Sequence, residues 1–126
     1  GPSGAEVLRP GRQAECVRKA DLGIWLESMG FVPEHPFRGR SGTRRWRFDW
    51  ALPADVADGT YAGVAVEYHG QGAHTHFVEG TWRDHEKATE AGLCGWLLIQ
   101  CNAMTAREGK CQDWVDAAMA KIREAS

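Results

Sequence analysis

The stretch RRWRFDWALP, residues 44–53, decides the fold that we expect for this chain. Its aromatic residues alternate with polar ones, so we expect Trp46, Phe48 and Trp50 on one face and Asp49 on the other. Period-two alternation predicts a β-strand with one buried face, which the final proline closes. The strand therefore places the carboxylate of Asp49 beside a core, where an unpaired charge is very costly.

A second acidic residue, Glu67, ends the next apolar run, YAGVAVEYHG at residues 61–70. Between the two runs, Asp58 and Gly59 form a strong turn signal, so we expect the two strands to pair as a hairpin. Asp49 and Glu67 would then lie at one end of the sheet. Two carboxylates with a backbone carbonyl and waters form the oxygen shell that Mg²⁺ accepts. The alternative is that each acid pairs with an arginine of the RRWRFD segment.

The rest of the chain supplies the other elements of the fold. We expect a helix over residues 12–30, an extended segment over 31–39, a loop over 70–81, a helix from 82 to Gly92 or Gly95, a strand buried on both faces over 96–101 and a last helix over 106–125. The order helix, two or three strands, helix, strand, helix predicts an α/β domain with a small mixed β-sheet flanked by helices.

The composition indicates the class of protein. The chain has 126 residues, a net charge of −2 and 43% hydrophobic residues, enough for one domain with a core and too few for two. We expect residues 5–126 to form that domain and residues 1–4 to be the remnant of a cleaved expression tag. No apolar run approaches the roughly 20 residues that span a membrane, so we expect a soluble, intracellular protein.

Four cysteines are present and form no CxxC pair: Cys16, Cys94, Cys101 and Cys111. Their neighbours are apolar or helical, so reduced, buried thiols are the expected state, with a disulfide or a zinc site as alternatives. No two histidines have the i,i+4 spacing of a zinc site on an expected helix.

An arginine-rich segment precedes the first expected strand and extends into it: Arg38, Arg40, Arg44, Arg45 and Arg47. Guanidinium groups suit phosphates, and Trp46 among them adds a flat aromatic face. The segment therefore favours nucleic-acid binding, and the alternative is a solvated turn of a hairpin.

Taken together, RRWRFDWALP (44–53), VAVEYHGQGAHTHF (64–77) and GTWRDHEKATEAGLCGWLLIQC (80–101) resemble the PD-(D/E)xK nuclease superfamily. More narrowly, they are similar to small phage and bacterial endonuclease-like proteins of the Holliday-junction-resolvase-like kind. The match covers roughly residues 38–102, and the succession RRWRFD, VxVE, DxEK and GW is more specific than a D…(D/E)xK pattern alone. The resemblance implies the restriction-endonuclease-like fold.

The same resemblance implies a set of metal ligands. Asp49 and Glu67 match the two metal-binding acids of the motif, and Tyr68 would contribute its backbone carbonyl. Many relatives have a further acid on the first helix, and the candidates are Asp21, which is nearest by position, then Glu15 and Glu27.

One position departs from the family pattern. His69 stands where the motif has a lysine or glutamate, which leaves two residues to assist the attacking water, His69 itself or Lys87. Lys87 and Asp84 match the D-x-E-K helix, from which a relocated lysine can face the metal. His74 or His76 corresponds to the loop histidine of the family, which we assign to nucleic-acid binding.

The function implied is Mg²⁺-dependent endonucleolytic hydrolysis of DNA, with Mn²⁺ as a substitute metal. Because so small a chain has no separate sequence-reading domain, we expect branched or otherwise structured DNA as the substrate, as in recombination or repair, and a homodimer that supplies two active sites. The expected location is the cytoplasm of a bacterium or of a phage-infected cell. The alternatives are a non-catalytic nucleic-acid-binding module that kept the fold, and an RNA-directed nuclease.

Overall fold

The computed structural model describes residues 18–70 and 77–126, with the backbone alone for residues 77–84. Its elements are α2 (Lys19–Ser28), β1 (Val32–Phe37), β2 (Trp46–Pro53), β3 (Gly63–His69), α3 (Phe77–Leu93), β4 (Trp96–Asn102), α4 (Ala103–Arg107) and α5 (Lys110–Ala125). This order confirms the expected succession of helix, strands, helix, strand and helix. In the described ranges, no helix is long and apolar enough to cross a membrane.

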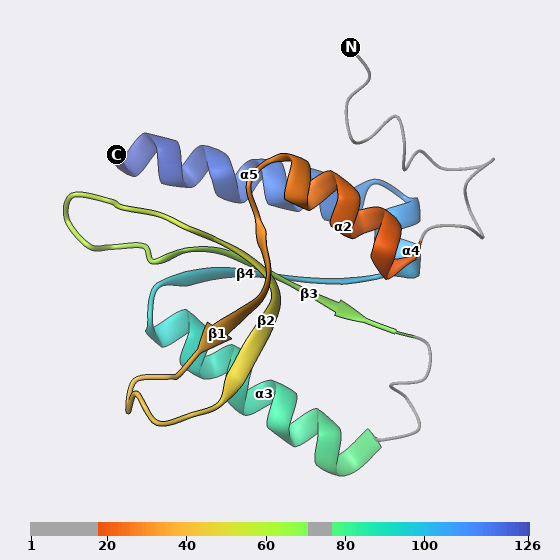
Figure 1. Cartoon of the computed structure of the whole chain (residues 1–126), viewed down its shortest axis with the longest axis horizontal. Coiled ribbons are helices and arrows are strands. Elements are labelled where there is room, and N and C mark those ends of the chain that lie inside the picture. Colours follow the sequence, from red (N-terminus) through yellow and green to blue (C-terminus); the bar gives the residue numbers. More distant parts are fainter. Residues whose placement is uncertain (1–17, 71–76) are drawn as a thin grey trace.

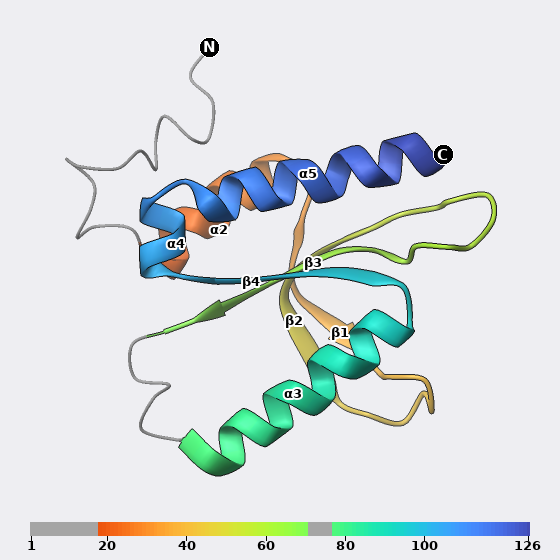
Figure 2. The ribbon, with the colours of Figure 1, turned by 180° about the vertical axis from the view of Figure 1, so that it is seen from behind.

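The four strands form one mixed sheet in the order β1-β2-β3-β4. The pairs β1–β2 and β2–β3 are antiparallel, and β3–β4 is parallel. Helices α2, α4 and α5 cover one face of the sheet, and α3 covers the other (Figures 1 and 2). The expected α/β class, a small mixed sheet flanked by helices, is therefore confirmed.

Each face of the sheet has its own apolar cluster. The cluster under α2 and α5 is built around Leu22, Leu26, Trp50, Val64, Val66 and Val115. The cluster under α3 contains Phe37, Phe48, Ala51, Ala65 and Ala91. Both clusters include residues of β2 and β3, so the two central strands are held from both sides.

Strand β1 lies at an edge of the sheet. This position explains how the VPEHPF segment forms a strand although it contains Pro33 and Pro36. Proline cannot donate a ladder hydrogen bond and is therefore confined largely to edge strands.

Two expected helix boundaries are wrong. Helix α3 begins at Phe77 rather than at residue 82, so residues 77–81 are not part of the loop expected there. A glycine inside a helix costs only about 1 kcal/mol, and Gly80 does not stop this one. The expected last helix is two helices, because Gly109, with φ 80°, turns the chain between α4 and α5.

Strand β4 is only partly buried, whereas we expected a strand buried on both faces. Its side chains do pack on both faces, with Leu97 and Ile99 against one cluster and Trp96 and Leu98 against the other. However, β4 ends the strand order, and these four residues are only partly buried. The reason is that a parallel strand at an edge has one side without a neighbouring strand.

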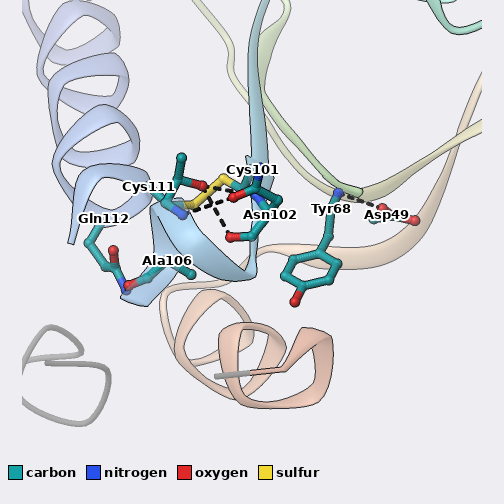
Figure 3. Close-up of a disulfide and its surroundings, with 8 residues drawn as sticks. Asp49, Tyr68, Cys101, Asn102, Ala106, Cys111 and Gln112 are labelled. Carbon is teal, nitrogen blue, oxygen red and sulfur yellow. Dashed lines mark hydrogen bonds between the residues drawn. A yellow bond between two sulfur atoms is a disulfide. The ribbon is translucent and has the colours of Figure 1, made fainter. Parts of the chain in front are cut away.

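The expectation of reduced thiols is wrong for one pair of cysteines. Cys101 at the end of β4 and Cys111 in the first turn of α5 form a disulfide (Figure 3). Both are buried, at 2% and 0% exposure, and Cys94 is a free cysteine. The bond ties α5 to the sheet through the turn made by α4. Because disulfides persist mainly in oxidising compartments, this bond gives no support to a cytoplasmic location.

Reduction of the disulfide is expected to lower the free energy of unfolding by about 2–3 kcal/mol, the entropy effect of closing a short loop. Urea unfolding with and without a reductant measures this difference. The control is the variant Cys101→Ser/Cys111→Ser, whose unfolding midpoint should not respond to reductant. Identical midpoints for the wild type in both conditions would contradict the prediction.

Candidate functional site

The candidate site lies where strands β2 and β3 stop pairing. Their register runs from Pro53↔Gly63 to Trp50↔Val66, and the next residues along are Asp49 and Glu67. At this point the backbone N–H of Asp49 donates to Glu67 Oε2, and the backbone N–H of Tyr68 donates to Asp49 Oδ2, each over 2.8 Å. Each carboxylate is thus held by the backbone of the opposite strand. The hairpin expected from the Asp58-Gly59 turn does bring the two acids together.

The alternation of strand β2 breaks at Asp49, which the sequence did not predict. Phe48 packs in the cluster under α3, whereas Trp50 packs in the cluster under α2 and α5. On the neighbouring strand β1, Glu34 lies between the register pairs of Phe48 and Trp50 and has a positive φ of 53°. Such a conformation is uncommon for a residue other than glycine. The local irregularity turns the two neighbours of Asp49 to opposite faces of the sheet.

Helix α2 approaches this irregularity closely. At Gly23 an added Cβ would lie 2.9 Å from the Trp50 ring, so a glycine lets the helix pack directly on that side chain. The Trp50 indole N–H also donates to Glu27 Oε2 over 3.2 Å. The first residue of α2, Lys19, is thereby brought to the site, and its Nζ donates to Asp49 Oδ1 over 3.0 Å.

Lys87 reaches the site from α3, on the other face of the sheet. Its ammonium donates to Glu67 Oε1 and to the backbone carbonyl of Arg47, and it lies 5.6 Å from the centre of the Phe48 ring. The side chains of Lys87 and Glu67 are each only 14% exposed. Burial raises the pKa of Glu67, and this effect exceeds the opposing one of Lys87 and the Asp49 N–H. The site therefore holds a mostly buried carboxyl group whose ionised form is supported by Lys87.

All four carboxylate oxygens consequently have a partner: Asp49 Oδ1 with Lys19, Asp49 Oδ2 with the Tyr68 N–H, Glu67 Oε1 with Lys87 and Glu67 Oε2 with the Asp49 N–H. Two acids and two lysines balance in charge. The sequence left open that each acid pairs with an arginine. In the structure, Asp49 and Glu67 pair instead with lysines from two helices.

His69, two residues beyond Glu67 on β3, has a different neighbour. Its Nε2 lies 3.1 Å from Oε1 of Gln100 on β4. Gln100 is the parallel register partner of Glu67, so it lies next to that acid in the sheet. His69 and Gln100 therefore extend the polar site along the ends of β3 and β4.

Asp21, the first-helix acid nearest by position, lies close enough to Tyr68 to affect it. Asp21 Oδ2 accepts from the backbone N–H of Arg18 over 3.1 Å, as part of the N-terminal cap of α2. The Tyr68 ring points toward this helix (Figure 3), and burial together with the charge of Asp21 raises the pKa of Tyr68. Within the described residues, no hydrogen bond joins Asp21 or Glu27 to Asp49 or Glu67; Glu15 lies outside them.

The arginine segment forms the turn between β1 and β2, and its members divide into two groups. Arg40 donates to Glu90 of α3 over 2.7 and 3.1 Å, which lowers the pKa of Glu90 to about 2. Arg44 pairs with Glu86 of α3 and lies over the Trp46 ring, 4.6 Å from its centre. These two arginines fasten the turn to α3.

The second group consists of Arg38, Arg45 and Arg47, which are exposed. Together with Arg44, Pro36 and Trp46 they line a hollow of about 340 Å³. In the described part of the chain, no carboxylate pairs with any of the three. They therefore form a positively charged surface, which is linked to the site through the Arg47 backbone carbonyl that accepts from Lys87.

Besides Glu15, three candidate site residues named from the sequence lie outside what the structure describes. His74 and His76 fall in residues 71–76, and the side chain of Asp84 falls in the part of α3 described by its backbone alone. Conversely, Lys19 and Gln100 belong to the site but were not expected there. Lys19 belongs to no recognisable motif, and Gln100 lies within an apolar segment, so neither gave a signal in the sequence. Only the folding of the chain brings them near the two acids.

The chemistry of the site agrees with a hard divalent metal. In residues 18–70 and 85–126, no group of three or more His, Cys, Asp or Glu side chains could hold a metal ion. The candidate site therefore offers two carboxylates as side-chain ligands, Asp49 and Glu67. Mg²⁺ is commonly bound by one or two carboxylates plus waters and substrate phosphate. The two acids thus suit Mg²⁺ in ligand type and number.

No family model matches the chain, and neither a curated protein nor a solved structure matches it.

Proposed function

We propose that this protein is a metal-dependent endonuclease that hydrolyses DNA phosphodiester bonds. The observation that carries the proposal is the cluster of Asp49, Glu67 and Lys87, in which two carboxylates from adjacent strands lie together and one of them, Glu67, contacts a mostly buried lysine from α3. Arginines without a carboxylate partner in the described chain line a hollow that includes Arg47, whose backbone carbonyl contacts Lys87. Acids for a metal, a cation for a phosphate and a basic surface for a polyanion are the parts that such a reaction needs.

Each residue has a specific task in the proposed reaction. Asp49 and Glu67 hold Mg²⁺, or Mn²⁺ as a substitute, with the Tyr68 carbonyl as a third oxygen. When bound, the ion lowers the pKa of a water and stabilises negative charge on the phosphate. Lys87, which already contacts Glu67, orients the attacking water or offsets phosphate charge. His69 lies at the margin of the site, where it contacts Gln100.

The basic surface favours recognition of DNA by its backbone. Arg38, Arg45 and Arg47 present guanidinium groups around one hollow, with Trp46 beside them. Contacts to phosphates fix a protein on nucleic acid and report shape rather than base identity. We therefore propose branched or structured DNA as the substrate, cut by a homodimer that supplies two sites.

Replacing Arg38, Arg45 and Arg47 with alanine is expected to weaken DNA binding on all sequences alike. The slope of log affinity against log salt should flatten by about 0.9 for each phosphate that an arginine no longer neutralises. Fluorescence anisotropy of labelled DNA over a series of salt concentrations measures the slope. The control is Arg123→Ala on α5, on the opposite face of the sheet, which should leave the slope unchanged. An unaltered slope in the triple variant would mean that the arginine segment is only a solvated turn.

The proposed activity is tested by incubating the protein with linear, supercoiled and four-way-junction DNA in Mg²⁺, in Mn²⁺ and in EDTA. Cleavage that requires metal and is fastest on the junction supports the full proposal. An RNA hairpin in the same series tests the alternative of an RNA-directed nuclease. Failure to cut any of these substrates with either metal would contradict the enzymatic proposal.

The second candidate is a nucleic-acid-binding module without catalysis. The observation that favours it is that His69 is engaged with Gln100, while all four oxygens of the two acids have partners within the protein. This alternative predicts DNA binding that depends on Arg38, Arg45 and Arg47, with no cleavage in either metal. The same substrate series therefore separates the two functions.

A further inference from the structure

The partners of the four carboxylate oxygens differ in how firmly they are held. Asp49 Oδ2 and Glu67 Oε2 accept from backbone N–H groups, which the strands fix in place. Glu67 Oε1 accepts from Lys87, whose side chain is mostly buried and also donates to the Arg47 carbonyl. None of these three partners can leave without moving a strand or breaking a second contact.

The fourth partner is Lys19, which binds Asp49 Oδ1 over 3.0 Å. Its side chain is 51% exposed, and besides Asp49 its ammonium has the Trp50 ring nearby, 5.8 Å away. Lysine carries its charge on a flexible four-carbon stem, and exposed ion pairs contribute little to stability. Lys19 can therefore turn into solvent while α2 stays packed on Trp50. Asp49 Oδ1 is the oxygen that an incoming cation can take most easily.

We infer that Lys19 is the resident cation of the metal-free site, and that its ammonium competes with the divalent metal for Asp49. This inference rests on the proposed function, because it concerns the same two acids. An ammonium and a metal ion cannot share one carboxylate oxygen at contact distance without strong repulsion between their charges. Lys19 thus raises the metal concentration that the site requires.

The test is direct measurement of Mn²⁺ binding, by electron paramagnetic resonance of the free ion, with no substrate present. Lys19→Met keeps the length of the side chain and removes its charge, and it is expected to bind Mn²⁺ about three- to fivefold more tightly than the wild type. Lys19→Arg keeps the positive charge and should bind no more tightly than the wild type. Lys121→Met, on the exposed side of α5, is the matched control that should leave the affinity unchanged.

A double variant locates the effect at Asp49. In the Asp49→Asn background, Lys19→Met should no longer tighten Mn²⁺ binding, because the carboxylate for which the two cations compete is gone. A gain that persists there would mean that Lys19 acts through a general field, and would overturn the inference.

The outcomes separate this inference from the proposed function. If the wild type binds Mn²⁺ and Lys19→Met binds it equally or more weakly, Lys19 positions Asp49 instead of competing, and the inference alone is wrong. If neither protein binds Mn²⁺, the metal site itself is wrong, and the inference and the proposed function fall together. Thermal unfolding of each variant shows whether the fold is kept.

Discussion

Asp49→Asn and Glu67→Gln are each expected to lower the rate of Mg²⁺-dependent DNA cleavage by at least about 10³-fold. Each change removes the charge of one of the two carboxylates that hold the metal. Each also keeps an amide oxygen that can accept the backbone N–H of Tyr68 or of Asp49. The fold should therefore persist while the reaction is abolished, and single-turnover cleavage with circular dichroism measures both.

Binding of DNA provides an independent readout for the same variants. Without metal, binding should persist or become tighter, because a negative charge facing the phosphates has been removed. Asp116→Asn and Glu124→Gln on α5 make the same chemical changes at exposed positions away from the site and should cleave normally. Wild-type cleavage by either Asp49→Asn or Glu67→Gln would show that the proposed metal site is wrong.

Lys87→Met is expected to lower the cleavage rate by about 10²-fold or more, whereas His69→Ala should cost less than about fivefold. The reason is that Lys87 contacts Glu67 directly, while His69 is engaged with Gln100. Methionine keeps the length of the lysine side chain and removes its charge, so a loss of rate reports the ammonium group.

The pH dependence of the Lys87 variant gives a second signature. Burial already raises the pKa of Glu67, and Lys87 opposes that shift. Without the lysine the pKa of Glu67 rises further, so the acid must be deprotonated at a higher pH before it can hold metal. The acidic limb of the rate profile should therefore move to higher pH in Lys87→Met and stay in place in His69→Ala.

Single-turnover cleavage between pH 6 and 9 separates the two residues. If His69 were the functional substitute for the motif lysine, the wild-type rate would change through the range in which histidines titrate, and that step would vanish in His69→Ala. Near-normal cleavage by Lys87→Met with an unshifted acidic limb would remove Lys87 from the mechanism.

Much of the pairing at the site could be predicted from local signals. The Asp58-Gly59 turn and the two apolar runs predicted a hairpin, and the antiparallel register of β2 and β3 confirms it. Because a hairpin relates residues at equal distances from its turn, Asp49 and Glu67 had to meet. The faces of β2 could not be predicted in the same way. Strict alternation placed Phe48 and Trp50 together, and the irregularity at Glu34 and Asp49 turns them to opposite clusters.

The sequence by itself determined the class of fold, the hairpin and the meeting of the two acids, because these depend on period-two patterns and a turn within one short stretch of chain. Only the tertiary structure decided which cations meet those acids and which arginines stay exposed. Lys19 is 30 residues from Asp49, and Arg40 is 50 residues from Glu90. Cys101 and Cys111 are near in sequence, yet their bond depends on how α4 turns the chain back onto the sheet. Such contacts form because helices pack on two faces of one sheet, and no local pattern encodes which side chains that packing brings together.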